Sequence, residues 1–253
     1  MPFATNNGFR IFYEAISSNG PPLILHHGLT SSGQHWKRSG YVTGIQDKFQ
    51  LILIDGRGHG KSDKSHKPDD YRLSTRALDV IAVADHINIA DFHYWGYSMG
   101  ASIGFGLMLN STHRIRSLVL GGAQPYQVPA GGPILKALEQ GPEAFLKMSE
   151  SNGRIVPEER RAEILSMDTK AIIAATQYPD ESNIIVPAVR NFERPTMIYS
   201  GAEDHNYDLI SQIPADNSNF EMVSLEGLNH MSCWGSVKKV TDISIAFLER
   251  NMD

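Results

Sequence analysis

The fold of this chain follows from the stretch YWGYSMGA at residues 94–101. The apolar residues that lead into it predict a short buried strand, and those that follow it, up to Leu109, predict a helix. Gly96 and Gly100 lie two residues before and after Ser98, where a very sharp turn brings the backbone too close for a Cβ atom. This pattern is typical of the strand–turn–helix unit that presents a serine hydroxyl above the carboxyl end of a strand. Ser98 is therefore the candidate nucleophile.

Apolar segments and helical patterns alternate on both sides of this stretch. Buried strands are expected at 23–27, 49–55, 92–95, 115–120, 195–200 and 220–225. A hairpin is expected at 3–16, because Asn7-Gly8 is a turn dipeptide. One helix is expected to contain both Trp36 and Ile45, and further helices are expected at 74–87, 101–109 and 237–249. This alternation predicts an α/β fold built on a mostly parallel, doubly wound sheet.

The alternation stops between residues 124 and 190. Prolines and glycines in this segment separate helical patterns near 133–140, 142–151, 157–167 and 169–177, and no strand is expected there. The sequence thus predicts one core domain, residues 1–123 and 191–253, with residues 124–190 inserted as a small helical cap. The apolar side chains of the cap either line the roof of a pocket or form the core of the cap itself.

The composition narrows the class of protein. A chain of 253 residues with 41% hydrophobic and 20% charged residues suits one soluble domain with a sizeable core. The net charge of −5 gives no reason to expect nucleic acid or a membrane as partner, and no apolar segment is long enough to span a bilayer. The N-terminus lacks a signal-peptide pattern, and the single cysteine, Cys233, excludes an intrachain disulfide. We expect a cytoplasmic monomer or homodimer.

Five short motifs resemble those of the α/β-hydrolase fold superfamily, in its serine esterase, enol-lactonase and haloperoxidase-like branch. They are His27-Gly28, DGRGHGKS at 55–62, GYSMG at 96–100, GAED at 201–204 and GLNH at 227–230. They occur in the order of that family, and the resemblance covers essentially the whole chain. It implies an α/β-hydrolase fold with a helical cap and a reaction that uses neither a cofactor nor a metal ion.

A serine hydroxyl is a weak nucleophile at neutral pH, so Ser98 needs a base that is in turn oriented by an acid. In the order typical of the family, His230 lies in an expected loop after the last strand and is the candidate base. Asp204 follows the strand at 195–200 and is the candidate acid. Glu203 is the alternative acid, because loop boundaries read from sequence are uncertain by a residue.

The remaining candidates for these roles are weaker. A family variant places the acid one strand earlier, but residues 120–124 contain no carboxylate. His26 and His27 close a strand and are expected to pack or hydrogen-bond beneath the next loop, His59 belongs to a glycine-rich loop, and His205 only follows the acid. No pair of histidines has the spacing of metal ligands on a helix, so a zinc hydrolase is not expected.

Ester cleavage also needs two preorganised donors for the oxyanion that forms on the substrate. The resemblance places them at the backbone N–H groups of Met99 and of Leu29, the residue after His27-Gly28. Aromatic side chains near these residues in the sequence, and one in the cap, are candidates for substrate contacts. They are Trp36, Tyr97, Tyr126 and Trp234.

These expectations describe a metal-independent carboxylic ester hydrolase. Its substrate is a small-to-medium ester or lactone, cleaved through an acyl intermediate on Ser98. Two alternatives use the same triad, namely a C–C bond hydrolase and a haloperoxidase-like perhydrolase. A third is a receptor for a small ligand that keeps the hydrolase fold and turns over slowly.

Overall fold

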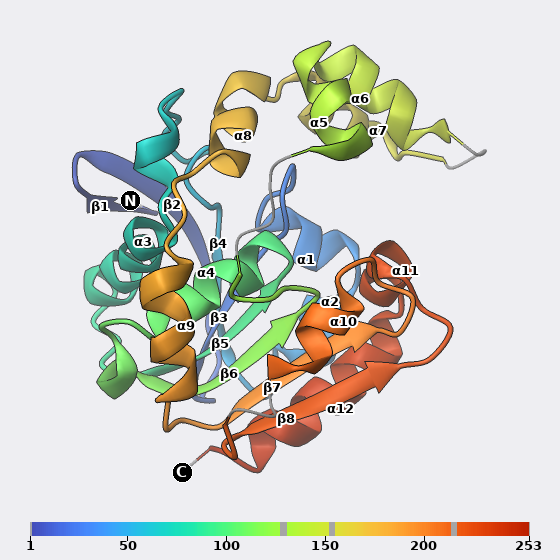
Figure 1. Cartoon of the computed structure of the whole chain (residues 1–253). Helices are drawn as coiled ribbons and strands as arrows, with labels where there is room; N and C mark the ends of the chain where they lie inside the picture. Colours follow the sequence, from blue (N-terminus) through green and yellow to red (C-terminus); the bar gives the residue numbers. More distant parts are fainter. Residues whose placement is uncertain (1, 127–130, 152–154, 214–216, 253) are drawn as a thin grey trace.

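The computed structural model describes residues 2–126, 131–151, 155–213 and 217–252, and in these residues it contains one eight-stranded sheet. The strand order is β1-β2-β4-β3-β5-β6-β7-β8 (Figure 1). The strands are β1 Phe3–Asn6, β2 Phe9–Ile16, β3 Pro22–His26, β4 Gln50–Ile54, β5 Phe92–Tyr97, β6 Ile115–Gly121, β7 Thr196–Gly201 and β8 Phe220–Leu225. Strand β2 pairs antiparallel with both β1 and β4, and all other pairs are parallel. The expected doubly wound sheet is confirmed.

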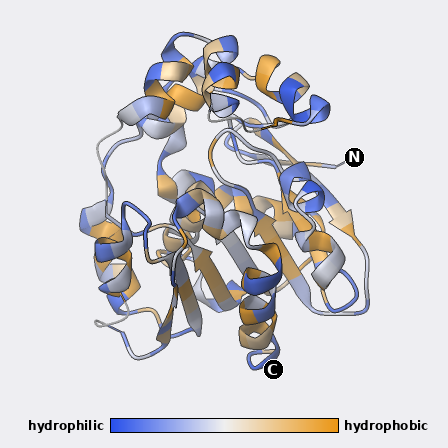
Figure 2. Cartoon of the chain, turned by 90° about the vertical axis from the view of Figure 1, so that its right-hand side faces the viewer, coloured by the Kyte–Doolittle hydropathy of each residue, from blue (hydrophilic) through white to orange (hydrophobic). Residues whose placement is uncertain are grey.

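Helices cover both faces of this sheet, and others form the segment between β6 and β7. The described helices are α1 Gln34–Arg38, α2 Tyr41–Ile45, α3 Leu73–His86, α4 Met99–Leu107, α5 Gly132–Glu139, α6 Pro142–Ser149, α7 Glu158–Leu165, α8 Thr169–Thr176, α9 Ser182–Arg190, α10 Tyr207–Ser211, α11 His230–Gly235 and α12 Val237–Glu249, with 3-10 turns η1 Pro68–Tyr71 and η2 Thr112–Arg114. One face carries α3, α4 and α9, and the other carries α1, α2, α11 and α12. In Figure 2 the strands between these layers are mostly hydrophobic.

The central strands are apolar on both faces because helices cover each side. Ile24 and Ile52 point to the α3–α4 side, and Leu25 and Trp95 point to the α12 side; all four are fully buried. Burial of such side chains contributes about 25 cal/mol per Å² of apolar surface. In the parallel register β3, β5, β6 and β7 end at the same edge, so the segments after them meet there.

The segment between β6 and β7 is helical in its described residues, while 127–130 and 152–154 of the expected insertion 124–190 lie outside them. Helices α5 to α8 group at the top of Figure 1. They bury a separate apolar cluster that includes Phe145, Ile164 and Ile172. These side chains therefore form the core of the cap, and Ile172 also lines a cavity beneath it.

Helix α9 behaves differently from the other helices of the insertion. Its Ile185 and Val189 belong to the main core cluster, the apolar side chains packed between the sheet and helices α3 and α4, and the helix contacts α4. It covers the sheet, although it lies within the expected cap range. The sequence did not predict it because Pro187 interrupts the helical pattern from inside the helix.

None of the helices that the structure describes is both long and apolar enough to cross a bilayer.

Candidate active site

Ser98 lies on a strained turn between β5 and α4. Its φ of 52° and ψ of −114° are unfavourable for any residue with a side chain. A Cβ on Gly96 would lie 2.4 Å from the backbone of Gly100, and a Cβ on Gly100 would lie 2.2 Å from the carbonyl oxygen of His26. Glycine is therefore required on both sides of the serine, as the sequence pattern predicts.

The structure brings Ser98, His230 and Asp204 into one hydrogen-bonded chain. His230 Nε2 lies 3.1 Å from Ser98 Oγ, and His230 Nδ1 lies 2.7 Å from Asp204 Oδ2. An ionised carboxylate only accepts, so Nδ1 carries the imidazole proton and donates it to Asp204. Nε2 is then the acceptor for the Ser98 hydroxyl, which is the arrangement that a general base requires.

Asp204 is buried at the end of β7 and is held by three groups. Besides His230, the backbone N–H of Asn206 donates to Oδ1 over 3.0 Å, and His205 Nδ1 lies 3.2 Å from the same oxygen. Burial alone raises the pKa of Asp204, but the hydrogen bond and charge of His230, with the Asn206 N–H, outweigh it. Its pKa lies below the ordinary value, so the carboxyl is ionised at neutral pH. Glu203, the alternative acid, is exposed and makes no contact with His230 among those described.

His230 occupies the first position of α11, where the sequence indicated a loop. Asn229 caps this helix by accepting from the N–H groups of Met231 and Ser232, while the Ser232 hydroxyl accepts from the Asn229 N–H. The Tyr97 hydroxyl donates to the backbone carbonyl of His230, and its ring packs against the imidazole with centroids 5.3 Å apart. A capped helix and a buried phenol thus fix the position of the candidate base.

Three of the four candidate substrate-binding aromatics lie beneath the site. Trp36 is fully buried against Tyr41, Trp95 and Trp234, so its prediction as a substrate contact is wrong. Its neighbours in sequence did not reveal that its side of α1 faces the sheet. Tyr97 and Trp234 are 4% and 7% exposed, and each packs on the other at 5.0 Å.

Tyr126 differs from these three residues. It follows β6 and is half-buried, with its N–H donating to Gln124 Oε1 over 2.5 Å. Its role in substrate binding stays a prediction.

The candidate oxyanion donors lie on the two segments that flank Ser98. Neither the Leu29 N–H nor the Met99 N–H has a hydrogen-bond acceptor among the residues that the structure describes. His27 orients the first of them, because its Nδ1–H donates to the Gly28 carbonyl over 2.7 Å and its Nε2 accepts from Gly56 N–H over 2.9 Å. The Gly28 carbonyl and the Leu29 N–H share one planar trans peptide and point in opposite directions. The His27 side chain therefore sets the direction of the Leu29 N–H.

Sequence reasoning missed the part played by Asp55, the first residue of the glycine-rich loop. Its carboxylate accepts from Gly33 N–H at 2.7 Å and Lys61 N–H at 2.8 Å, and a Cβ on Gly60 would lie 2.1 Å from it. Asp55 thus ties this loop to the segment that follows Leu29. A carboxylate at a strand end before three glycines was the available signal.

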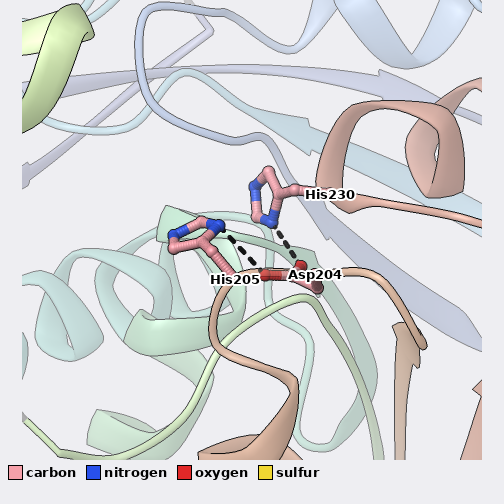
Figure 3. Close-up of side chains that lie close together, drawn as sticks. All are labelled: Asp204, His205 and His230. Carbon is pink, nitrogen blue, oxygen red and sulfur yellow. Dashed lines mark hydrogen bonds and ion pairs between the residues drawn. The ribbon is translucent and has the colours of Figure 1, made fainter.

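One cluster in the described residues could hold a metal ion. It consists of Asp204, His205 and His230, whose ligand atoms lie within 4.8 Å of one another (Figure 3). The carboxylate oxygens point at Nδ1 of both imidazoles, and the Asp204–His230 contact is a short hydrogen bond. A metal ion there would have to displace the proton that links His230 to Asp204.

A cavity of about 250 Å³ lies between the core loops at 30–34 and 55–64 and the cap helices α7 and α8. Ser98 is not among its lining residues, which include Thr30, Lys64, Arg160, Glu163 and Asp168. Because the reactive geometry is at Ser98, we assign the site to the triad; the cavity is a separate feature that reaches the candidate oxyanion loop at Thr30.

Comparisons with known proteins agree with this geometry. Residues 21–150, just over half of the chain, match the family described as alpha/beta hydrolase fold. A non-heme haloperoxidase of Rhodococcus erythropolis is 31% identical over 150 residues, which cover 57% of this chain and 50% of that protein. The 3-oxoadipate enol-lactonase 2 of Acinetobacter baylyi is 32% identical over 117 residues, covering 44% of this chain and 42% of that protein. The chain thus spans about half the length of the curated relatives it matches.

The likeness in three dimensions extends over nearly the whole chain. The enol-lactonase from Burkholderia xenovorans LB400 superposes with a TM-score of 0.83 at 20% identity, covering 98% of this chain and 100% of that chain. At that identity the likeness concerns the fold. The sheet order, the strained serine turn and the family match lead to one conclusion: this chain belongs to the α/β-hydrolase fold family.

Proposed function

We propose that this protein is a serine hydrolase that cleaves a small-to-medium carboxylic ester or lactone through an acyl intermediate on Ser98. The observation that carries the proposal is the hydrogen-bonded chain from Ser98 Oγ through His230 to Asp204. It supplies a nucleophile, a base and an orienting acid at the distances that the chemistry needs. The name of the enol-lactonase relative supports a small lactone as the substrate.

The first half-reaction forms the acyl enzyme. Ser98 Oγ attacks the carbonyl carbon while His230 Nε2 accepts the hydroxyl proton, and the carbonyl oxygen becomes an oxyanion. The N–H groups of Leu29 and Met99 are the proposed donors to that oxygen, and losing one such donor costs about 10²-fold or more in kcat. As the tetrahedral species collapses, the bond to the leaving oxygen breaks and His230 Nε2–H protonates it.

The second half-reaction restores the enzyme. Water attacks the acyl carbon and gives a proton to His230 Nε2, so a second tetrahedral oxyanion forms. Its collapse breaks the bond to Ser98 Oγ, which takes the proton back, and the carboxylic acid leaves. For a lactone the alcohol and acid are parts of one product. Asp204 stabilises the imidazolium at each stage and keeps the ring oriented.

The experiment combines active-site labelling with turnover. We expect a fluorophosphonate to label Ser98 and the wild-type protein to hydrolyse members of a panel of p-nitrophenyl esters and lactones. Ser98→Ala abolishes both signals, whereas Ser211→Ala, a serine that bonds only within α10 among the described contacts, leaves them unchanged. A folded wild-type protein that is not labelled would overturn the proposal. Labelling without turnover on the panel would favour the slow receptor.

The proposed reaction uses no metal ion or cofactor. Activity is expected to survive EDTA, and added Zn²⁺ is expected to inhibit, because binding at Asp204, His205 and His230 would take Nδ1 away from the acid. His205→Ala should weaken this inhibition and keep the activity, because His230 and the Asn206 N–H still hold Asp204. Loss of activity on chelation, restored by the metal, would reverse the assignment of this cluster.

A further inference from the structure

One cap helix reaches the backbone of the candidate oxyanion loop. Arg160 of α7 donates from Nη2 to the carbonyl oxygen of Thr30 over 2.8 Å. Thr30 directly follows Leu29 and has a φ of 63°, a left-handed conformation that β-branched residues rarely adopt. A backbone in this conformation persists only where its surroundings hold it. The guanidinium of Arg160 is one such holding group.

The guanidinium is itself held from the core. Arg160 Nη1 lies 3.2 Å from Glu163 Oε2 on the same helix. Arg38 of α1 donates hydrogen bonds to both carboxylate oxygens of Glu163, at 2.5 and 2.8 Å. Side-chain exposures of 23% for Arg38, 18% for Arg160 and 30% for Glu163 place this network partly out of water, where paired charges are weakened less by salt. A continuous path thus runs from α1, through the cap, to the loop that carries Leu29.

The carbonyl groups of Gly28 and Thr30, on either side of Leu29, are held in different ways. At the Gly28 carbonyl the holding group is His27, which belongs to the core and does not depend on the cap. At the Thr30 carbonyl it is Arg160, which is in place only when α7 lies against the core. The Leu29 side chain likewise lies between core and cap, because it packs against the apolar clusters of both.

We infer that Arg160 is a positioning residue that couples docking of the cap to assembly of the oxyanion hole. With the cap docked, Arg160 holds Thr30 and so restricts the rotation of the Leu29 N–H. With the cap displaced, His27 and Asp55 still restrain the segment from the core, but Arg160 no longer holds the Thr30 carbonyl. Donors that are aimed before the reaction need no reorganisation when the oxyanion forms. The inference rests on the proposed function, since it concerns the donor assigned to that reaction.

The test compares Arg160→Met with Arg161→Met. Arg161 is the adjacent arginine of α7 and pairs with Glu150 and Glu158 inside the cap, so its loss perturbs the cap without touching the loop. The first measurement is the rate at which a fluorophosphonate labels Ser98, because the phosphonyl group places an oxygen in the oxyanion hole. We expect labelling to slow about tenfold in Arg160→Met and less than about twofold in Arg161→Met.

Steady-state kinetics on a neutral p-nitrophenyl ester provide the second measurement. A positioning role lowers kcat about tenfold and leaves KM nearly unchanged, since the oxyanion exists only in the transition state. Arg160→Lys keeps the charge but loses the fork of the guanidinium, so it should fall between wild type and Arg160→Met. It also serves as the test variant if Arg160→Met does not fold, with the same required split between kcat and KM.

The outcomes separate this inference from the proposed function. Wild-type protein that is not labelled at Ser98 sinks the proposed function itself. Wild-type labelling with unchanged rates in the Arg160 variants overturns the inference alone. The inference is also overturned if Arg161→Met slows labelling as much as Arg160→Met does, because that would indicate general loosening of the cap. It is overturned as well if only KM rises in the Arg160 variants, because Arg160 would then be a substrate contact in the cavity between core and cap.

Discussion

His230 Nδ1 lies 2.7 Å from Asp204 Oδ2, so the first residue of α11 is hydrogen-bonded to the segment that follows β7. The contact joins residues 26 positions apart in the chain. It also determines the tautomer of the imidazole, because the carboxylate can only accept. With the proton on Nδ1, Nε2 is free to accept from Ser98 Oγ at 3.1 Å. The chemistry proposed for this protein depends on that single proton position.

Asp204→Asn therefore tests the acid. An amide can donate to Nδ1 and stabilise the wrong tautomer, so kcat is expected to fall about 10³- to 10⁴-fold while the fold is kept. Steady-state kinetics with circular dichroism would measure both. The matched control is Glu203→Gln, because Glu203 is the neighbouring carboxylate and is exposed. A larger loss in the control would transfer the role of the acid to Glu203.

Gly100→Ala tests the steric argument for the serine turn. The new Cβ would lie 2.2 Å from the His26 carbonyl oxygen, which is backbone and cannot move aside. We expect the free energy of unfolding to fall by about 3 kcal/mol or more, measured by urea denaturation. Gly235→Ala is the control, because nothing lies within 4 Å of its added Cβ. The control should be neutral or stabilise by up to about 1 kcal/mol, and equal effects at the two sites would refute the argument.

Lowering the pH should begin to destabilise this protein at pH values well above those at which carboxylates titrate. Burial lowers the pKa of His93 to about 4 and that of His35 to about 4. An unfolded histidine titrates near pH 6.5, so as pH falls from 6.5 towards 4 the unfolded chain binds protons that the folded chain does not. Stability is thus full above about pH 6.5 and declines below it, by at most about 1.4 kcal/mol per pH unit for each histidine.

Urea midpoints between pH 7.5 and 4.5 would measure this decline. His93 is fully buried and hydrogen-bonds through Nδ1 to Ser117 Oγ at 2.7 Å, so His93→Leu changes stability at every pH. The informative quantity is the slope of unfolding free energy against pH, which should become shallower in the variant. A slope identical to that of wild type would mean that His93 is protonated in the folded state.

A buried ion pair anchors the glycine-rich loop to α3. Arg57 donates from Nε and Nη2 to the two oxygens of Asp79 at 3.0 and 2.7 Å, and both side chains are almost wholly buried. Asp79→Asn leaves the guanidinium without its counter-charge, and we expect a loss of about 3–5 kcal/mol in unfolding free energy. The double variant Arg57→Met with Asp79→Leu removes both charges and should recover most of that loss. A double variant as unstable as Asp79→Asn would show that packing, not charge, is responsible.

Much of the fold was predictable because hydrophobic periodicity and the positions of turn residues are local properties of the sequence. The hairpin around Asn7-Gly8, the apolar strands and the amphipathic helix near 74–87 appear within a few residues of where the patterns place them. Two elements differ. The single helix expected around Trp36 is two short helices, because Gly40 lies between them with a φ of 90°. Helix α9 contains a proline, and its stability comes from contact with α4 rather than from propensity.

The site was predictable to the extent that chain order determines it. Parallel strands end at one edge, so Ser98, Asp204 and His230 follow strands that deliver them to the same place. Which side of a helix faces the sheet was not readable for Trp36, because α1 is too short to show a period. The pairing of Arg160 with Thr30 joins residues 130 positions apart and has no signal in either local pattern.

The sequence by itself determined the strand–turn–helix unit at Ser98 and the presence of a helical insertion, because both follow from sterics and periodicity within about ten neighbouring residues. The order of the candidate triad residues was implied by the resemblance to the family. Only the tertiary structure decided which nitrogen of His230 carries the proton, that Trp36 and Tyr97 lie beneath the site, and that Arg160 reaches the loop of Leu29. The reason is physical, since hydrogen bonds and burial depend on distances in space that a linear pattern does not contain.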